Sequence, residues 1–332
     1  MGCFLGVDLG GTKTHMVIAD EKGRTLGFGE SGGGNHQGVG YDGMYRVLRI
    51  ALGEALKSAG LKEKDITGAG FSIAGYDWLS EKEINMAVID KLGLDAPYEL
   101  VNDAIPGLVA GSEEGWGVGV VSGTGCNCRG WDRDHKREGR VTGYGIMMGE
   151  AAGGTELAYR AMQLVGYEWM QRGPKTALTQ IFIKYAGAED LEDLLEGYTE
   201  GHYQVRADAA PLIFEAAREG DTVAQDLICW AGQELGEMAI SVIRQLAFEK
   251  LNFDVVLSGS MFEGGAPLID PMRETIQKIA PGARMVRLTV PPVVGAVLIG
   301  MEKGGVKNGP EVRKLLAESL KTLLQSAALR EV

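Results

Sequence analysis

Close to its N-terminus the chain carries residues suited to binding phosphate. Asp8 is followed by two glycines, two threonines and a lysine: Gly10, Gly11, Thr12, Lys13 and Thr14. Apolar residues on both sides of this run predict a β-hairpin with the glycines at its turn. Glycines let backbone N–H groups approach an anion, and the hydroxyls and the lysine add donors and a positive charge. The run indicates a phosphate-binding loop, although a plain turn would also fit, and Asp8 could hold a magnesium ion through water.

Two later stretches repeat this pattern of an apolar strand that ends in small polar residues. Ser122, Gly123, Thr124 and Gly125 follow an apolar stretch at 117–121, and Ser258, Gly259 and Ser260 follow another at 253–257. The earlier of the two indicates a structural duplicate of the N-terminal hairpin. Two Gly-Thr loops in one chain favour a two-sided phosphate clamp over turns without a ligand.

Polar residues that could bind a substrate lie in a glycine-rich loop and at a strand end. Asn35 and His36 belong to the loop at 31–38, which could equally be a solvated linker. Asn102 and Asp103 end a predicted strand, and ligands bind at the carboxyl ends of strands in open α/β sheets. Asp103 could instead cap the helix that is predicted to follow it.

The cysteines give little sign of a disulfide framework or a metal site. The chain has four: Cys3, Cys126, Cys128 and Cys229. Cys126 and Cys128 could bind a metal with His135 as the nearest further soft ligand, but a closed zinc site takes four ligands and none of the usual paired spacings is present. We therefore expect free thiols.

Composition limits the classes of partner. The chain has 332 residues, 45% of them hydrophobic, and a net charge of −12. This acidic balance argues against nucleic acid or an anionic membrane as a partner, since no basic excess is available to neutralise phosphates. No apolar run reaches the ~18 residues of a membrane span, and residues 1–20 lack a signal-peptide pattern, so we expect a cytoplasmic protein. Fifty glycines, many near predicted strand ends, suggest close approach of backbone to ligand at several places.

The order of predicted elements indicates an α/β protein with two domains, as the length also suggests. Strands and helices alternate over residues 1–115, which we expect to form the first domain. A larger second domain at 116–305 begins with the repeated hairpin and contains a mostly helical part at 174–250. A final helix within 306–332 has an apolar face, and we expect it to pack back on the first domain.

Taken together, these motifs resemble those of the sugar kinases in the actin and hexokinase superfamily of ATPases. More narrowly, the chain is similar to the N-acetylglucosamine kinase and BadF/BadG-type ATPase family over residues 4–301. The resemblance implies two ribonuclease-H-like domains with a central cleft for ATP and sugar. It also implies ATP and Mg²⁺ as cofactors, with Asp8 as the residue that holds the magnesium ion. The implied substrate is a small sugar, and the implied assembly is a homodimer.

The resemblance assigns a role to each motif. The loops at 10–14 and 122–125 correspond to the two phosphate loops, and the segment 258–260 corresponds to the adenosine motif. Asp103 falls where the family has its catalytic base. Residues matching the sugar-binding positions are Asn35, His36, Asn102, Asp103, Thr124, Asn127, Glu150 and Gly154.

One departure from the family pattern concerns the sugar side of the site. The family commonly has Gly-Asp-Glu-Gly-Ser-Gly where this chain has a segment from Gly149 to Gly154 with Glu150 in place of the aspartate. The extra methylene displaces the carboxylate by more than a hydrogen bond tolerates unless the loop shifts. The departure bears on the identity of the sugar more than on phosphoryl transfer. The zinc-binding cysteines of the related ROK sugar kinases are missing.

The main prediction is an ATP-dependent kinase that phosphorylates the 6-hydroxyl of an amino sugar, N-acetylglucosamine or glucosamine. An alternative within the same family is an ATPase that activates 2-hydroxyacyl-CoA dehydratases or benzoyl-CoA reductases, in which Cys126 and Cys128 of two chains would hold an iron–sulfur cluster. A third possibility is a sugar-sensing or assembly protein that binds nucleotide without transferring phosphate. Asn35 and the pair Asn102 and Asp103 favour the kinase, because they could bind a hydroxylated substrate and an electron donor has no use for them.

Overall fold

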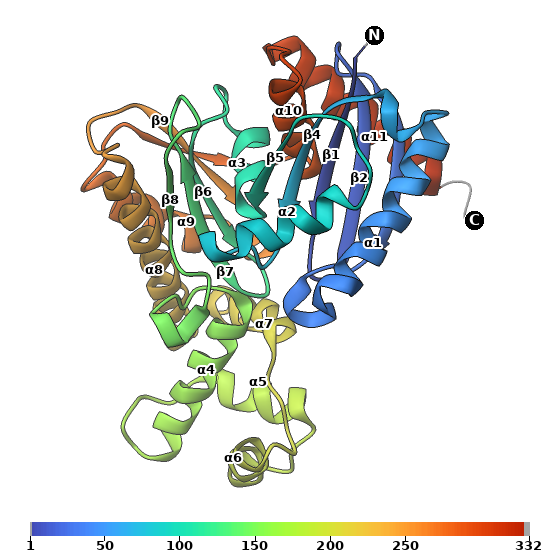
Figure 1. Cartoon of the computed structure of the whole chain (residues 1–332). Coiled ribbons are helices and arrows are strands. Elements are labelled where there is room, and N and C mark those ends of the chain that lie inside the picture. Colours follow the sequence, from blue (N-terminus) through green and yellow to red (C-terminus); the bar gives the residue numbers. More distant parts are fainter. Residues whose placement is uncertain (1, 329–332) are drawn as a thin grey trace. The chain divides into compact units, whose positions relative to one another are not determined.

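The computed structural model describes residues 2–328, which divide into two compact units (Figure 1). Unit 1 comprises Met1–Gly117 and Val286–Val332, and unit 2 comprises Val118–Met285. The sequence placed the segment 286–305 in the second domain, whereas here it belongs to unit 1. The physical reason is the packing of one helix, α10 (Val293–Lys303), on the sheet of unit 1.

Unit 1 is built on a mixed five-stranded sheet with the order β3-β2-β1-β4-β5. Its strands are β1 (Cys3–Leu9), β2 (Lys13–Asp20), β3 (Thr25–Gly32), β4 (Ile66–Ile73) and β5 (Tyr98–Asn102). The hairpin strands pair antiparallel, while β1, β4 and β5 run parallel. The carboxyl ends of β1, β4 and β5 therefore meet at one edge, where Asp8 and Asn102 lie.

Helices cover both faces of this sheet. They are α1 (His36–Ala59), α2 (Lys82–Asp90), α3 (Ala104–Gly111), α10 and α11 (Pro310–Ala328), with short 3-10 turns η1 (Glu63–Asp65) and η2 (Leu79–Glu81). Gly27 and Gly29 of β3 face α1, because a Cβ on either would overlap the backbone of that helix. Gly6 of β1 lies on the opposite face and contacts α10 in the same close manner.

Several glycines inside the strands allow close packing between helix and sheet. A Cβ on Gly70 would overlap the carbonyl oxygen of Ala296, and one on Gly68 would overlap that of Gly300. Residues without a side chain thus allow α10 to lie directly on β1 and β4 (Figure 1). Close packing of this kind explains why α10, although distant in sequence, belongs to unit 1.

Helix α11 packs on unit 1 through two buried leucines and polar contacts with earlier elements. Leu316 and Leu320 are fully buried. Ser319 Oγ lies 3.0 Å from Thr25 Oγ1, and Arg313 Nη1 donates to the carbonyl oxygen of Val109 at 2.6 Å. Because Val109 lies in the last turn of α3, the arginine satisfies a carbonyl that has no partner within that helix.

Unit 2 repeats the sheet topology of unit 1. Its order is β10-β9-β6-β7-β8, which matches β5-β4-β1-β2-β3 strand for strand. The strands are β6 (Gly117–Ser122), β7 (Cys126–Trp131), β8 (Glu138–Arg140), β9 (Phe253–Ser258) and β10 (Ala283–Arg287). The predicted duplication is therefore confirmed, and the fold is α/β with two mixed five-stranded sheets.

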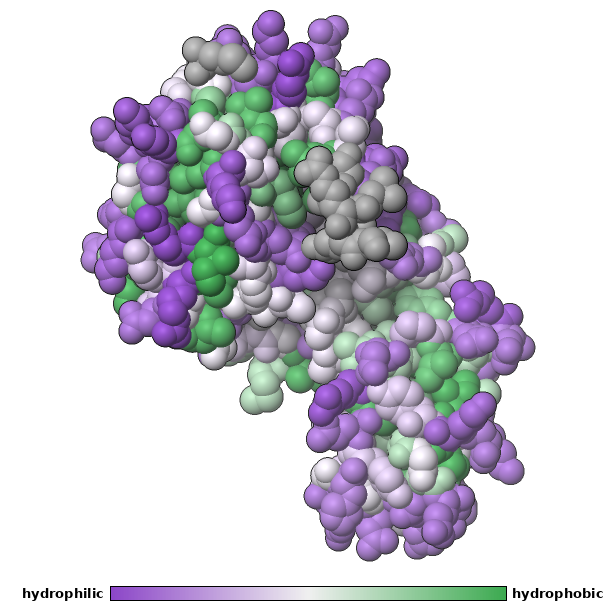
Figure 2. Space-filling view, turned by 90° about the vertical axis from the view of Figure 1, so that its right-hand side faces the viewer, coloured by the Kyte–Doolittle hydropathy of each residue, from purple (hydrophilic) through white to green (hydrophobic). Residues whose placement is uncertain are grey.

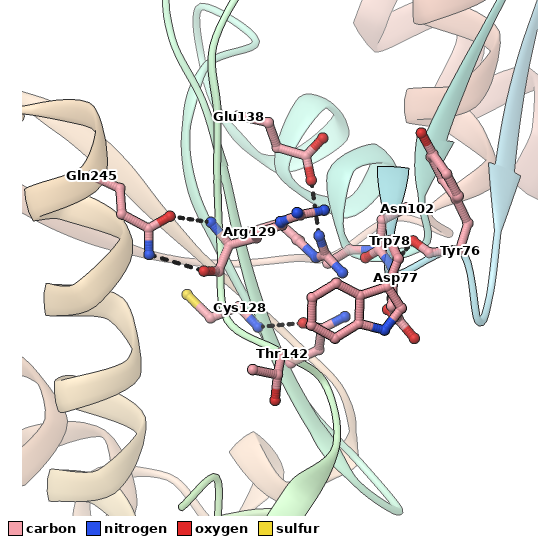
Figure 3. Close-up of polar contacts among 12 residues, drawn as sticks. Tyr76, Asp77, Trp78, Asn102, Cys128, Arg129, Glu138, Thr142 and Gln245 are labelled. Atoms are coloured by element: carbon pink, nitrogen blue, oxygen red, sulfur yellow. Dashed lines mark hydrogen bonds and ion pairs between the residues drawn. The ribbon is translucent and has the colours of Figure 1, made fainter. Parts of the chain in front are cut away.

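The helices of unit 2 include one long helix that packs on the sheet and several shorter ones. A long helix, α8 (Thr222–Leu246), packs against α9 (Ala266–Gln277) and the strands β7 and β8. The remaining helices are α4 (Gly154–Trp169), α5 (Ala177–Ala186), α6 (Leu191–Glu200) and α7 (Ala210–Arg218), with 3-10 turns η3 (Gly145–Met148), η4 (Ala207–Ala209) and η5 (Ser260–Gly264). The edge strand β8 is tied to α8, because the Gln245 amide bonds both backbone groups of Arg140 at 2.9 Å (Figure 3).

The surface shows no continuous apolar belt on the face seen in Figure 2. Most outer atoms there belong to hydrophilic residues, and hydrophobic residues form small separate groups. Within residues 2–328, no helix combines the length and the apolar character needed to cross a membrane.

Candidate active site

The turn of the first hairpin has the geometry expected of an anion-binding loop. Gly10 N–H donates to the carbonyl oxygen of Lys13 at 2.9 Å and closes the turn. Gly11 is exposed, and a Cβ added there would meet no atom within 4 Å. Thr12 and Lys13 are also exposed. Gly11 to Lys13 therefore leave room for an anion beside the backbone.

Thr14 differs from the sequence prediction. Its side chain is fully buried, and Oγ1 donates to the carbonyl oxygen of Gly32 at 2.9 Å. The hydroxyl thus joins β2 to β3 and does not face a phosphate. The sequence could not show this, because the partner carbonyl lies on a strand whose register is set by tertiary packing.

Asp8 lies in a row of polar side chains that crosses four strands. The register places Asp8 opposite both His15 and Ser72, and His15 opposite Glu30. Ser72 Oγ donates to Asp8 Oδ1 at 3.3 Å, and His15 Nε2 lies 2.9 Å from Glu30 Oε2. Burial raises the pKa of the Asp8 carboxyl above its usual range, while His15 and the bond from Ser72 act in the opposite direction. A bound cation would relieve the cost of burying this charge, so the site fits a magnesium ion.

Asn35 and His36 form a junction between α1 and the loop after β4. Asn35 caps α1, since its Oδ1 accepts from Gln37 N–H at 2.9 Å. A Cβ on Gly75 would lie 2.5 Å from the same Oδ1, so the amide packs against that loop. His36 is buried, stacks on the Tyr41 ring, and has Nε2 3.6 Å from Glu81 Oε1. The polar loop is therefore a folded part of unit 1.

Asn102 and Asp103 have separate roles at the end of β5. Asn102 is buried. Its Nδ2 donates to the Tyr76 carbonyl oxygen at 3.0 Å and to Asp77 Oδ1 at 3.1 Å (Figure 3). Its Oδ1 accepts from Ala104 N–H at 3.1 Å. Asp103 makes no cap hydrogen bond to α3. The alternative that Asp103 merely caps the helix thus loses its basis, because Asn102 performs that task.

In unit 2 the predicted second phosphate loop, residues 122–125, is held by the start of α4. Gly154 N–H donates to the Gly123 carbonyl oxygen at 2.8 Å, and Thr155 N–H donates to that of Thr124 at 2.9 Å. Ser122 is buried and its Oγ donates to the Ala152 carbonyl oxygen at 2.6 Å. Thr124 and Gly125 are exposed, and they are the part of the loop that a phosphate could reach.

A pocket of about 520 Å³ lies beside this loop within unit 2. Its walls are Gly123, Thr124, Ala207, Asp208, Ala210, Pro211, Phe214, Arg218, Ser260, Met261, Glu263 and Gly264. This volume is in the range of nucleotide-sized pockets, and its lining combines apolar side chains with a few polar groups. A Cβ on Gly264 would overlap the Phe214 ring, so the glycine lets that ring form a wall. Its size and lining are suited to a nucleoside-sized ligand.

Of the lining residues, only Gly123, Thr124 and Ser260 belong to motifs predicted from the sequence. The wall formed by Ala207, Pro211, Phe214 and Arg218 was not predicted. These residues recur every three or four positions, so they share one side of η4 and α7. The spacing was visible in the sequence, but it is equally typical of a helix that packs on a core.

The predicted sugar residues Asn127 and Glu150 are engaged within unit 2. Asn127 Oδ1 accepts from Cys128 N–H at 2.8 Å. Glu150 is buried, and its Oε1 accepts from Thr142 N–H at 2.6 Å and from Thr142 Oγ1 at 2.7 Å. Its Oε2 accepts from Gly145 N–H at 3.3 Å. Glu150 therefore holds the loop at 142–150 together.

The paired cysteines are buried thiols on β7. Burial raises the pKa of the Cys126 thiol to about 12 and that of the Cys128 thiol further still. Since thiolates bind metals and clusters, this environment disfavours that chemistry. Next to them, the buried Arg129 pairs with Glu138 at 3.1 Å (Figure 3). In the described part of the chain, no group of three or more His, Cys, Asp or Glu residues is arranged to hold a metal.

Comparison with solved structures agrees with this architecture. A candidate N-acetylglucosamine kinase of Chromobacterium violaceum has a TM-score of 0.63 and 24% identity, covering 90% of this chain and 99% of its own. A ROK family glucokinase of Streptomyces griseus, solved with glucose and AMPPNP, has a TM-score of 0.54 and 20% identity, covering 90% and 98%. At these identities the likeness establishes the fold of two actin-like ATPase domains.

Two relatives with sugar-kinase names match 90% of the chain each. The N-acetyl-D-glucosamine kinase of Dictyostelium discoideum is 30% identical over 312 residues, covering 90% of this chain and 97% of the relative. The N-acetylmuramic acid/N-acetylglucosamine kinase of Clostridium acetobutylicum is 26% identical over 301 residues, covering 90% and 98%. The model of the BadF/BadG/BcrA/BcrD ATPase family matches residues 5–300. With this match added to the duplicated sheets and the two Gly-Thr loops, the chain belongs to the BadF/BadG/BcrA/BcrD ATPase family.

Proposed function

We propose that this protein is an ATP-dependent kinase that transfers the γ-phosphoryl group of ATP to the 6-hydroxyl of an amino sugar, N-acetylglucosamine or glucosamine. The observation that carries the proposal is Asp103, a carboxylate at the end of β5 that makes no cap hydrogen bond to α3 while Asn102 makes one. The two kinase relatives support the substrate class. The burial of Cys126 and Cys128 weighs against the alternative of an iron–sulfur ATPase.

The proposed mechanism gives each described group a task. The pocket beside the loop at 122–125 binds the adenosine, and the exposed parts of both Gly-Thr loops donate backbone N–H groups to the phosphates. Asp103 accepts the proton of the sugar hydroxyl as the oxygen attacks the γ-phosphorus. The bond from that phosphorus to the bridging oxygen breaks, and ADP leaves. Magnesium held near Asp8 would neutralise charge that develops on the phosphates.

A panel of sugars tests the function. Purified protein with Mg²⁺ and ATP should release ADP only when an amino sugar is present, and the product should carry phosphate on the 6-oxygen. N-Acetylglucosamine and glucosamine are the key members, with glucose and N-acetylmuramic acid as comparisons. ADP release that is independent of every sugar would reject the kinase, and an iron content with absorbance in the visible range would support the iron–sulfur alternative.

Replacing Asp8 by Asn should stabilise the fold and weaken the use of Mg²⁺ in turnover. Since the folded pKa of Asp8 is raised, its contribution to stability is fully present below the unfolded pKa and is lost as pH rises through the folded pKa. At pH 7 the buried charge therefore destabilises the nucleotide-free protein. We expect Asp8→Asn to raise the melting temperature at pH 7 and to raise the Mg²⁺ concentration needed for half-maximal turnover. The gain should shrink on acidification, and a lower melting temperature at pH 7 would contradict this account.

A further inference from the structure

Two glutamates lie at the sugar-side loop of unit 2, and the structure gives them different surroundings. Glu150 is 5% exposed as a residue, and both oxygens of its carboxylate accept hydrogen bonds, from Thr142 and from Gly145. Each of these donors belongs to the same loop. Most of the acceptor capacity of the Glu150 carboxylate is therefore used within the loop that it helps to fold, which leaves little for a ligand.

Glu156 is less enclosed. It is only partly buried, and its Oε2 accepts from the N–H of Gly153, the N-cap residue of α4, at 3.0 Å. Its Oε1 faces Gly145, where an added Cβ would lie 3.1 Å away. Burial and the nearby charge of Glu150 raise the pKa of Glu156, so the two carboxylates belong to one cluster.

Glu156 also adjoins the second phosphate loop. A Cβ on Gly153, whose N–H Glu156 accepts, would overlap the backbone of Gly125. Thr155, the residue before it, donates its N–H to the Thr124 carbonyl oxygen at 2.9 Å. The adenosine pocket is lined by Gly123 and Thr124 of this loop and does not include Glu156. The carboxylate is thus next to the phosphate loop but outside the adenosine pocket.

Two other expected sugar ligands in unit 2, Gly154 and Asn127, each have one polar atom engaged within the unit. The N–H of Gly154 bonds to Gly123, and Asn127 Oδ1 accepts the N–H of Cys128. A sugar hydroxyl is best held by an anionic acceptor, since hydrogen bonds to charged groups are stronger than neutral ones. At this loop Glu156 is the carboxylate that stays partly exposed, whereas Glu150 is buried.

We infer that Glu156 accepts a hydrogen bond from a hydroxyl of the sugar substrate, and that Glu150, which replaces the family aspartate, is a positioning residue that shapes the loop. The inference rests on the proposed function and deepens it by naming a side chain that binds the sugar. It explains how a chain with a longer acid at position 150 keeps a carboxylate available for the substrate: the loop closes around Glu150, and Glu156 supplies the acceptor.

The test is Glu156→Gln, measured with the amino sugar that the wild type phosphorylates. The glutamine side-chain oxygen can accept the Gly153 N–H as the glutamate does, so the melting temperature should change little. Loss of the charged acceptor should raise the KM for the sugar about tenfold or more, with the KM for ATP within about twofold of wild type. Glu156→Asp provides a second variant that retains the charge but withdraws it by one methylene, and it should raise the sugar KM as well.

Glu168→Gln is the matched control. Glu168 lies on the same helix and also accepts a backbone N–H, that of Thr176 at 3.1 Å, but it lies about 18 Å further along the axis. Its sugar KM should equal that of the wild type. A wild-type sugar KM in both Glu156 variants, or an equal rise in Glu168→Gln, overturns the inference. A wild type without sugar-dependent turnover instead means that the proposed function has failed.

Discussion

Asp103→Asn should lower kcat by about 10²–10⁴ with little change in the melting temperature or in ATP binding. Asparagine is nearly isosteric with aspartate and is an equally good N-cap residue, but it cannot take a proton at neutral pH. The structure makes the comparison of Asp103→Asn with the wild type sharper, because the Ala104 N–H already donates to Asn102 Oδ1 at 3.1 Å. No cap hydrogen bond from Asp103 is available to be lost.

The measurement is sugar-dependent ADP release at saturating ATP and sugar, with ATP affinity determined separately by calorimetry. Asp190→Asn is a suitable control, because Asp190 caps α6 through the Asp193 N–H at 2.9 Å and no role is proposed for it. It should retain wild-type kcat. If Asp103→Asn keeps most of its turnover, the assignment of the base is wrong, whatever the identity of the sugar.

The sequence was most informative where local pattern determines structure. The glycine-tipped hairpin, its duplicate, and the strand ends that carry Asp8 and Asn102 follow from turn chemistry and from alternation along strands. Both sheets show these features in the expected order. Local pattern could not assign α10 to unit 1, since that depends on which sheet offers a face of glycines, here Gly6 and Gly70, for close packing.

Side-chain roles were harder to predict than elements. Thr14 and Glu150 have residue types suited to ligand binding, yet each bonds the backbone of its own unit. Conversely, the wall that Phe214 forms in the pocket beside the loop at 122–125 carries no motif. A motif records which groups a segment contains, whereas their availability to a ligand depends on which donors and acceptors the rest of the fold brings near them.

Asn102 illustrates the same point in the other direction. Its position before Asp103 suggested a ligand for the substrate, but the structure gives its side-chain amide three partners. The amide nitrogen donates to the carbonyl oxygen of Tyr76 and to the carboxylate of Asp77, and the amide oxygen accepts from the Ala104 N–H. A buried amide with these contacts fixes the end of β5 relative to the loop after β4. It thereby determines where the neighbouring aspartate stands, which is a positioning role.

Gly11→Val should abolish detectable ATP binding while the protein remains folded. Gly11 is exposed, its φ is not among the left-handed ones, and an added Cβ meets no atom within 4 Å, so valine is tolerated without ligand. The branched side chain would then occupy the space that a phosphate needs to reach the backbone N–H groups. Loss of those charge-assisted hydrogen bonds and the steric overlap act together, and the affinity should fall by at least about 10².

The measurement is calorimetric titration with Mg·ATP, alongside the melting temperature without nucleotide. Gly53→Val is the matched control, since Gly53 is exposed on α1 and an added Cβ there also meets no atom within 4 Å. It should bind ATP as the wild type does, at a small cost in helix stability. ATP affinity that is unchanged in a folded Gly11→Val protein would show that the N-terminal turn is not a phosphate loop. The nucleotide would then have to be held by unit 2 alone, through the loop at 122–125 and the pocket beside it.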